Sequence, residues 1–200
     1  MTNRISSRWG GKAALAMIVA AGLASVSNAA IISYSANLDG PSEAPPNGSP
    51  GTGVALVDLD TVLLTMRVRV TFSGLLGTTT ASHIHAATSA PFAGTAGVAT
   101  QTPSFSGFPL GVTSGSMDTT FDMTLGSSFN STYVTANGGT PASARAALWQ
   151  AIADGKAYLN IHTSVVGGGE IRGFLTPVPA PGAAGVLGLA GLVTIRRRRA

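Results

Sequence analysis

Alternating apolar and polar residues in the middle of the chain predict β-strands. The clearest run spans residues 62–72, where one face carries Leu64, Met66, Val68, Val70 and Phe72. We expect this face to pack in a core and the opposite face to contact water, because side chains alternate across a strand. Weaker runs predict further strands at 31–38, 52–59, 119–125, 156–163 and 170–175.

The sequence between these runs is rich in residues that form turns. Asp58–Thr61 predicts a hairpin connection, and Gly167–Gly169 predicts a second hairpin. Residues 86–117 are dominated by Ala, Gly, Thr, Ser and Pro and predict long loops. The pattern is typical of an all-β fold, an antiparallel β-sandwich of immunoglobulin or superoxide-dismutase type.

One short helix is predicted near the C-terminal part of this domain. It begins at Thr140 or Pro141, which suit the N-cap and the first helical position, and it ends before Gly155. An apolar stripe at helical spacing would pack the helix across one end of the sandwich. The stripe consists of Ala144, Ala147, Leu148, Ala151 and Ile152.

The distribution of charge argues against a nucleic-acid partner. The 200-residue chain has no Cys and a formal charge of +4, but seven of its twelve basic residues lie near the two ends. The central part has five basic and eight acidic side chains, so its own formal charge is −3. The positive field that binding to nucleic acid requires is therefore missing from the predicted domain.

The N-terminal 29 residues are typical of a secretory signal peptide. A basic region up to Lys12 precedes an apolar run at 13–26 and then small residues, which predicts cleavage between Ala29 and Ala30. The apolar run is shorter than the roughly 20 residues that cross a bilayer. We therefore expect the export machinery to act on this chain and the mature domain to span residues 30–176.

The C-terminal segment, residues 177–200, has the composition of a second sorting segment. Val178-Pro179-Ala180-Pro181 precedes an apolar stretch at 182–195 and then Arg196, Arg197, Arg198 and Arg199. This order resembles the PEP-CTERM signal of bacteria, which implies an exosortase as partner, a transient anchor in the inner membrane, and release at the cell surface. A permanent tail anchor with its arginines on the inner side is the alternative.

The three histidines of the chain lie in two compact motifs, Ser82-His83-Ile84-His85 and Asn160-Ile161-His162-Thr163. In a strand, His83 and His85 project from the same face, and His162 could approach them from another strand. Three neutral imidazoles are typical ligands of a zinc or copper site. Alternatively, the rings hydrogen-bond one another, Glu170 or the backbone and hold the strands in register.

Motifs along the whole central part resemble those of the CHRD domain, a family named after the animal protein chordin. The resemblance implies a β-sandwich of immunoglobulin or superoxide-dismutase type and no established activity. It covers residues 31–175 and is carried by Tyr34–Gly40, Glu43–Pro46, Gly51–Gly53, Phe72–Leu75, His83–His85, Gly155–Thr163 and Gly169–Gly173.

Two functions follow as expectations. The first is a non-enzymatic module at the cell surface or in the extracellular matrix that contacts proteins or polysaccharides. No nucleophile elbow, phosphate loop or paired-carboxylate motif argues for an enzyme. The alternative is a copper- or zinc-binding protein that uses His83, His85 and His162, with a metal-dependent redox activity left open. Superoxide dismutases are similar in their His-x-His motif but use more histidines and a disulfide.

Overall fold

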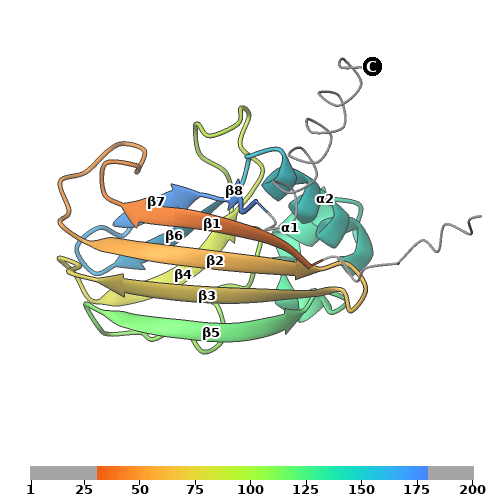
Figure 1. Ribbon diagram of the computed structural model, residues 1–200, viewed down its shortest axis with the longest axis horizontal. Helices are drawn as coiled ribbons and strands as arrows, with labels where there is room; N and C mark the ends of the chain where they lie inside the picture. The colour runs from red at the N-terminus through yellow and green to blue at the C-terminus, as the bar shows by residue number, and fades with distance from the viewer. Residues whose placement is uncertain (1–30, 180–200) are drawn as a thin grey trace, which may run out of the picture.

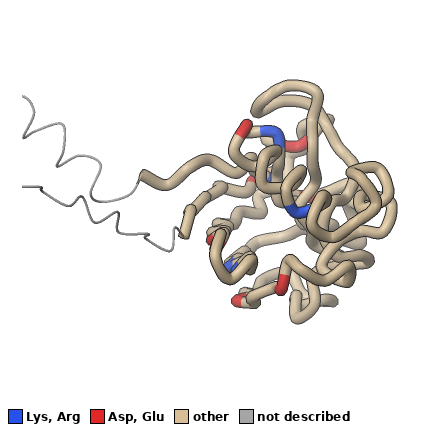
Figure 2. Tube along the Cα trace, turned by 90° about the vertical axis from the view of Figure 1, so that its right-hand side faces the viewer, with Lys and Arg blue, Asp and Glu red and all other residues tan. Residues whose placement is uncertain are grey.

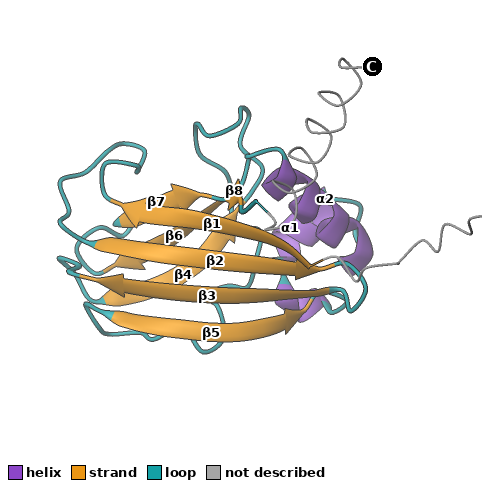
Figure 3. Ribbon diagram, viewed as in Figure 1, coloured by secondary structure: helices purple, strands orange, loops and turns teal. Residues whose placement is uncertain are grey.

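The computed structural model describes residues 31–179, which form a strongly curled antiparallel sheet with short helices at one end (Figures 1 and 3). The strands are β1 (Ile31–Asp39), β2 (Thr52–Asp60), β3 (Thr65–Ser73), β4 (Thr79–His85), β5 (Gly115–Asp122), β6 (Tyr158–Thr163), β7 (Ile171–Phe174) and β8 (Thr176–Pro177). The helices are the 3₁₀ turn η1 (Gly126–Ser128), α1 (Ser131–Ala136) and α2 (Pro141–Ala153).

The strand order is β4-β6-β7-β1-β2-β3-β5, and β8 pairs with β1. Strands β1 and β7 share one residue pair in the ladder, Asp39 with Arg172. The sheet curls at this junction, so that β4, β6 and β7 lie behind β1, β2 and β3 (Figure 1). The predicted all-β, sandwich-like fold is thus confirmed, with a single continuous sheet forming both layers.

Alternation in β3 supplies one wall of the core. Met66, Val68, Val70 and Phe72 are at most 2% exposed, whereas Arg67 and Arg69 point outward and pair with Asp118 and Asp58. Ile84, Leu159, Ile161 and Ile171 supply the opposite wall from β4, β6 and β7, and none of them is exposed to solvent. The outward face of that second layer therefore has to be covered by loops or contact solvent.

The turn between β2 and β3 lies later in the sequence than the predicted connection at Asp58–Thr61. Strand β2 continues through Asp60, and residues 61–64 form the turn, in which Leu64 has φ of 55°. The Asp60 carboxylate accepts hydrogen bonds from the N–H groups of Val62 and Leu63. The Asp residues therefore lie at the end of the strand and stabilise the turn from there.

Helix α2 matches the predicted helix. Thr140 is the N-cap and forms a capping box with Ser143, Pro141 begins the helix, and Gly155 has the left-handed φ of 68° after its end. The structure adds α1, which the sequence analysis did not predict. Its residues Thr132, Val134 and Thr135 are β-branched, and the Asn130 side chain that accepts from Thr132 N–H is its main helix signal.

Within residues 31–179, no helix combines the length and the apolar character needed to cross a membrane.

The carboxylate of Glu170, fully buried between the layers, joins three segments of the chain. It accepts hydrogen bonds from Ser49 Oγ at 2.6 Å and Thr163 Oγ1 at 2.5 Å, and from the N–H groups of Leu76 and Gly77. Burial raises the pKa of Glu170, but the four hydrogen bonds together lower it by a larger amount, so the pKa lies below its usual value.

Replacing Glu170→Gln should destabilise the fold by about 3 kcal/mol, because the amide nitrogen would face donors that need an acceptor. The measurement is the free energy of unfolding in denaturant. Asp122→Asn is the matched control: its carboxylate is exposed and bonds only to Thr124, so a cost below about 1 kcal/mol is expected. Equal losses in the two variants would contradict the structural role of Glu170.

Candidate metal centre

The three histidines lie together on the outward face of β4 and β6. In the β4–β6 ladder, His83 is opposite Asn160 and His162 is opposite Ala81, so all of these side chains share one face. His85 follows on the same face because Ile84 turns inward to the core. The predicted convergence of the two histidine motifs is therefore present in the structure.

The rings are close and differently oriented. Ring centroids are 4.8 Å apart for His83 and His162, 5.3 Å for His83 and His85, and 5.7 Å for His85 and His162. The ring planes are tilted or perpendicular to one another, at angles from 39° to 75°. One ring nitrogen of each histidine lies within 4.8 Å of those of the other two.

Each histidine uses its second ring nitrogen to hydrogen-bond a backbone carbonyl. His83 Nε2 contacts Pro103 O at 3.0 Å, His85 Nδ1 contacts Ala96 O at 2.9 Å, and His162 Nδ1 contacts Gly167 O at 3.0 Å. A carbonyl oxygen can only accept, so each of these nitrogens must carry the proton. This assignment fixes the tautomer of all three neutral rings.

The remaining nitrogens, His83 Nδ1, His85 Nε2 and His162 Nε2, are therefore bare lone pairs. All three are buried and have no hydrogen-bond partner. An unsatisfied buried acceptor destabilises a fold by about 1–3 kcal/mol, so three of them in one cluster are unusual unless a ligand binds them. A metal-ligating histidine typically donates its other N–H to a carbonyl or carboxylate, and all three rings follow this pattern.

The electrostatic environment keeps the rings neutral. Burial is the largest cause that lowers the pKa of His83 and of His85, each to about 4, and it also lowers the pKa of His162. Neighbouring imidazoles lower the values for His83 and His85 further, and the carbonyl bonds oppose the shift. At neutral pH the cluster offers lone pairs and no charge, which suits a cation.

The structure adds neighbours to which the sequence analysis gave no role at this site. Tyr158 stacks on His85 with an interplanar angle of 4° and a centroid distance of 4.9 Å. Arg172 lies over the Tyr158 ring at 4.7 Å and also near the Glu43 carboxylate, at 3.8 Å. Alternation with His162 in β6 could have indicated Tyr158 and Asn160, but nothing local marks Glu43.

Of the alternative partners predicted for the histidine rings, the backbone is used and Glu170 is not. Gly169, with φ of 131°, precedes Glu170, and β7 begins only at Ile171. Glu170 lies among the neutral donors described above, and Arg172 faces Glu43 instead. The histidines use backbone carbonyls, two from the loop between β4 and β5 and one from the β6–β7 turn.

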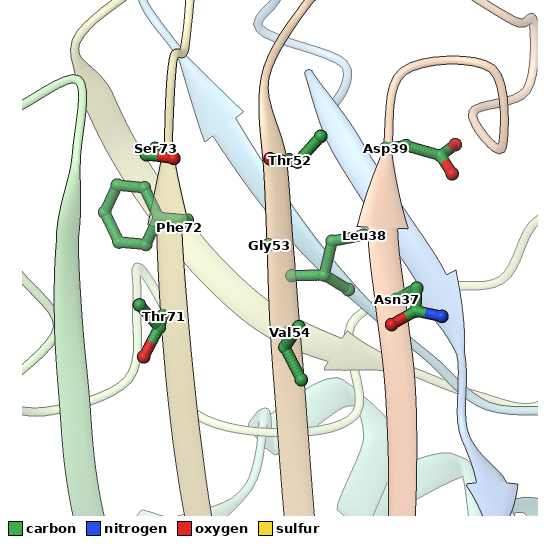
Figure 4. Close-up of a pocket in the computed structure, with 9 residues that line it drawn as sticks. All are labelled: Asn37, Leu38, Asp39, Thr52, Gly53, Val54, Thr71, Phe72 and Ser73. Atoms are coloured by element: carbon green, nitrogen blue, oxygen red, sulfur yellow. The ribbon is translucent and has the colours of Figure 1, made fainter.

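A second feature, a hollow over Gly53 on strands β1 to β3, has no comparable chemistry (Figure 4). Asn37, Thr52, Thr71 and Ser73 contribute short polar side chains to its lining. Basic positions along the described trace are few and scattered (Figure 2).

The predicted sorting residues fall mostly outside the described part. Of the C-terminal motif, Val178 and Pro179 are described, and Val178 N–H donates to Ser33 O beside β1. The Ala29–Ala30 cleavage point, Ala180, Pro181 and Arg196–Arg199 lie outside residues 31–179.

The fold and this cluster together define an all-β sandwich domain with a three-histidine cluster, two of its residues buried and one half-buried, on the outer face of one layer. The sequence model of the CHRD domain matches residues 34–175, and the chain belongs to this family. Searches of curated proteins and of solved structures gave no match.

The lowered pKa values of His83 and His85 give the metal-free protein a pH-dependent stability. Between pH 6.5 and about 4 the unfolded chain binds these protons and the folded chain does not, so stability should fall as the pH is lowered through this window. Glu43 opposes the trend, because burial raises its pKa to about 7 and it favours the folded state as the pH falls from 7 to 4.5.

Denaturant unfolding from pH 7 to pH 4 measures this slope. Three histidines of lowered pKa, with His162 added to His83 and His85, oppose one carboxyl of raised pKa. We therefore expect a net loss of stability toward pH 4, and a smaller loss in His83→Asn, which has one fewer of these protons to bind. An identical pH dependence in the variant would contradict the assignment to His83.

Proposed function

We propose that this CHRD domain binds one zinc or copper ion through His83, His85 and His162. The observation that carries the proposal is a cluster of three rings, each with one buried nitrogen that lacks a partner and another nitrogen held by a carbonyl. One ring nitrogen of each histidine lies within 4.8 Å of those of the other two. An ion bound there would give each of the three nitrogens the partner that it lacks.

The elements around the cluster support this role by fixing the ligands before any ion arrives. Strands β4 and β6 set the spacing of the rings, and the three carbonyls set their rotation and tautomer. Tyr158 restrains the plane of His85 by stacking, and its hydroxyl lies beside Ala96, whose carbonyl holds the same ring. Preorganised ligands lose little conformational entropy when they bind.

The first test is metal stoichiometry and affinity of the purified protein, by elemental analysis and by titration with zinc and copper. We expect one ion per chain. His83→Ala, His85→Ala and His162→Ala should each weaken binding by about 100-fold or more, since even losing a partner of a ligand typically costs 10- to 100-fold. Binding should also raise the free energy of unfolding, by about 2.7 kcal/mol at 100 times Kd.

Tyr34→Phe is the matched control for these variants. Tyr34 lies in β1 with its side chain in the core, and the change removes only a hydroxyl, so the affinity should equal that of the parent. His162 is the most exposed of the three ligands, so its variant is the one expected to keep the fold. A folded protein that takes up no ion, or histidine variants that bind as well as the parent, would contradict the proposal.

We further propose that the domain works outside the cytoplasm, as an exported protein processed by an exosortase-type enzyme. The sequence patterns at 1–29 and 177–200 support this location. Contact with surface or matrix proteins or polysaccharides, without catalysis, stays a prediction for the same exported form.

Intact mass measurement of the protein from its producing cells tests the location. We expect a mature N-terminus at Ala30 and loss of the C-terminal segment. A variant with Ser in place of Arg196–Arg199 should keep that segment. Recovery of a full-length chain beginning at Met1 from the cytoplasmic fraction would contradict export.

A further inference from the structure

We propose that the three-histidine site selects a monovalent copper ion, Cu(I), over the divalent ions Zn(II) and Cu(II). The inference rests on the proposed function, because it specifies the ion that His83, His85 and His162 hold. It depends on three features of the described residues: the charge of the donors, the number of donors and the charge of the surroundings.

The donor set is neutral. Among the described residues, the cluster that could hold an ion at this place contains three histidines and no carboxylate or thiolate. Each imidazole is in a fixed neutral tautomer, because the N–H points to a carbonyl. The full charge of a bound ion therefore stays on the complex.

The number of donors is also low, and the free nitrogens are closed to solvent. Zinc in proteins is almost always four-coordinate, and a three-histidine zinc site takes water as its fourth ligand through an open position. Cu(I) forms stable complexes with three ligands and needs no water. A closed site with three donors thus provides the coordination number that Cu(I) accepts, but not the fourth ligand that Zn(II) needs.

Among the described residues, the carboxylate near this face is that of Glu43, and it faces the guanidinium of Arg172, so it leaves little negative charge to offset a second positive one. Strand β6, which carries Tyr158, lies between β4 with His85 and β7 with Arg172. The guanidinium carbon of Arg172 is 4.7 Å from the centre of the Tyr158 ring. The negative charge of Glu43 can at most neutralise the positive charge of Arg172, whose Nε lies 3.8 Å from Glu43 Oε2. Asn160, opposite His83 in the ladder, presents a neutral amide whose Oδ1 is buried without a partner.

These features act together because the cost of burying an ion rises with the square of its charge. A divalent ion in a neutral, buried site loses about four times the hydration free energy that a monovalent ion loses there. Imidazole is a ligand of both copper and zinc, so the donor type by itself excludes neither metal, and the selectivity has to come from charge and coordination number. Charge and coordination number then both favour Cu(I).

The test is an anaerobic competition titration of the whole purified protein. Cu(I) is held with the chelator bathocuproine disulfonate, and parallel titrations use Zn(II) and Cu(II) with their own chelators. We expect Cu(I) to bind at least about 100-fold more tightly than Zn(II), and more tightly than Cu(II). His162→Ala should abolish the Cu(I) binding.

A charge variant tests the physical cause. Asn160→Asp places a carboxylate opposite His83, and it should narrow the preference for Cu(I) over Zn(II) by roughly tenfold or more. Asn37→Asp makes the same chemical change at an exposed position of β1 and should leave the preference unchanged. Circular dichroism checks that both variants are folded. If either variant does not fold, the ratio of Cu(I) to Zn(II) affinity in the parent protein still tests the selectivity.

The outcomes separate the two proposals. Zn(II) or Cu(II) binding as tight as Cu(I), and lost in His162→Ala, would keep the metal site and overturn its selectivity. Failure of all three ions to bind would overturn both. Tight Cu(I) binding with an unchanged preference in a folded Asn160→Asp would overturn the electrostatic cause of the preference.

Discussion

The buried carboxylate of Glu170 is the interaction on which the rest of the structure depends most. It holds the end of β6 through Thr163, the loop after β1 through Ser49, and the segment after β3 through Leu76 and Gly77. Thr163 follows His162 directly, and the same β6–β7 turn supplies the Gly167 carbonyl that orients the His162 ring. A charge in the interior, fully paired with donors, thus fixes both the sheet and one ligand of the site.

The second layer of the sheet is polar on the side that most small sandwiches leave to solvent. Histidines, Asn160 and Arg172 line its outer face, and the loop between β4 and β5 covers them with carbonyls from Gly94, Ala96 and Pro103. Covering polar groups is costly unless each finds a partner. Most of them do, and the exceptions on this face are one ring nitrogen of each histidine, Asn160 Oδ1 and Glu43 Oε1. The histidine nitrogens are the ones that the proposed ion would bind.

Arg172 connects this face with the loop after β1. Its guanidinium donates to Ser42 O and Gly94 O and lies over two aromatic rings, Tyr158 and Phe174. Because it occupies the place next to Tyr158, the histidine cluster has a cation rather than a carboxylate as its charged neighbour. The chemistry of the site is therefore set by residues distant in the sequence as well as by the ligands.

The sequence by itself determined most of the strands and helix α2, and the buried side of the clearest strands, because alternation and capping are local. It predicted no strand at Thr79–His85 (β4), and it placed the start of β5 at residue 119 instead of Gly115, inside the stretch 86–117 that was predicted to be loops. It also placed His83 and His85 on one face, since two residues apart in a strand always share one. Only the tertiary structure decided the β4–β6 register that brings His162 to them, the carbonyls that fix their tautomers, and the separate partners of Glu170 and Arg172. These contacts join segments up to 130 residues apart, and local propensity carries no information about which distant segments meet.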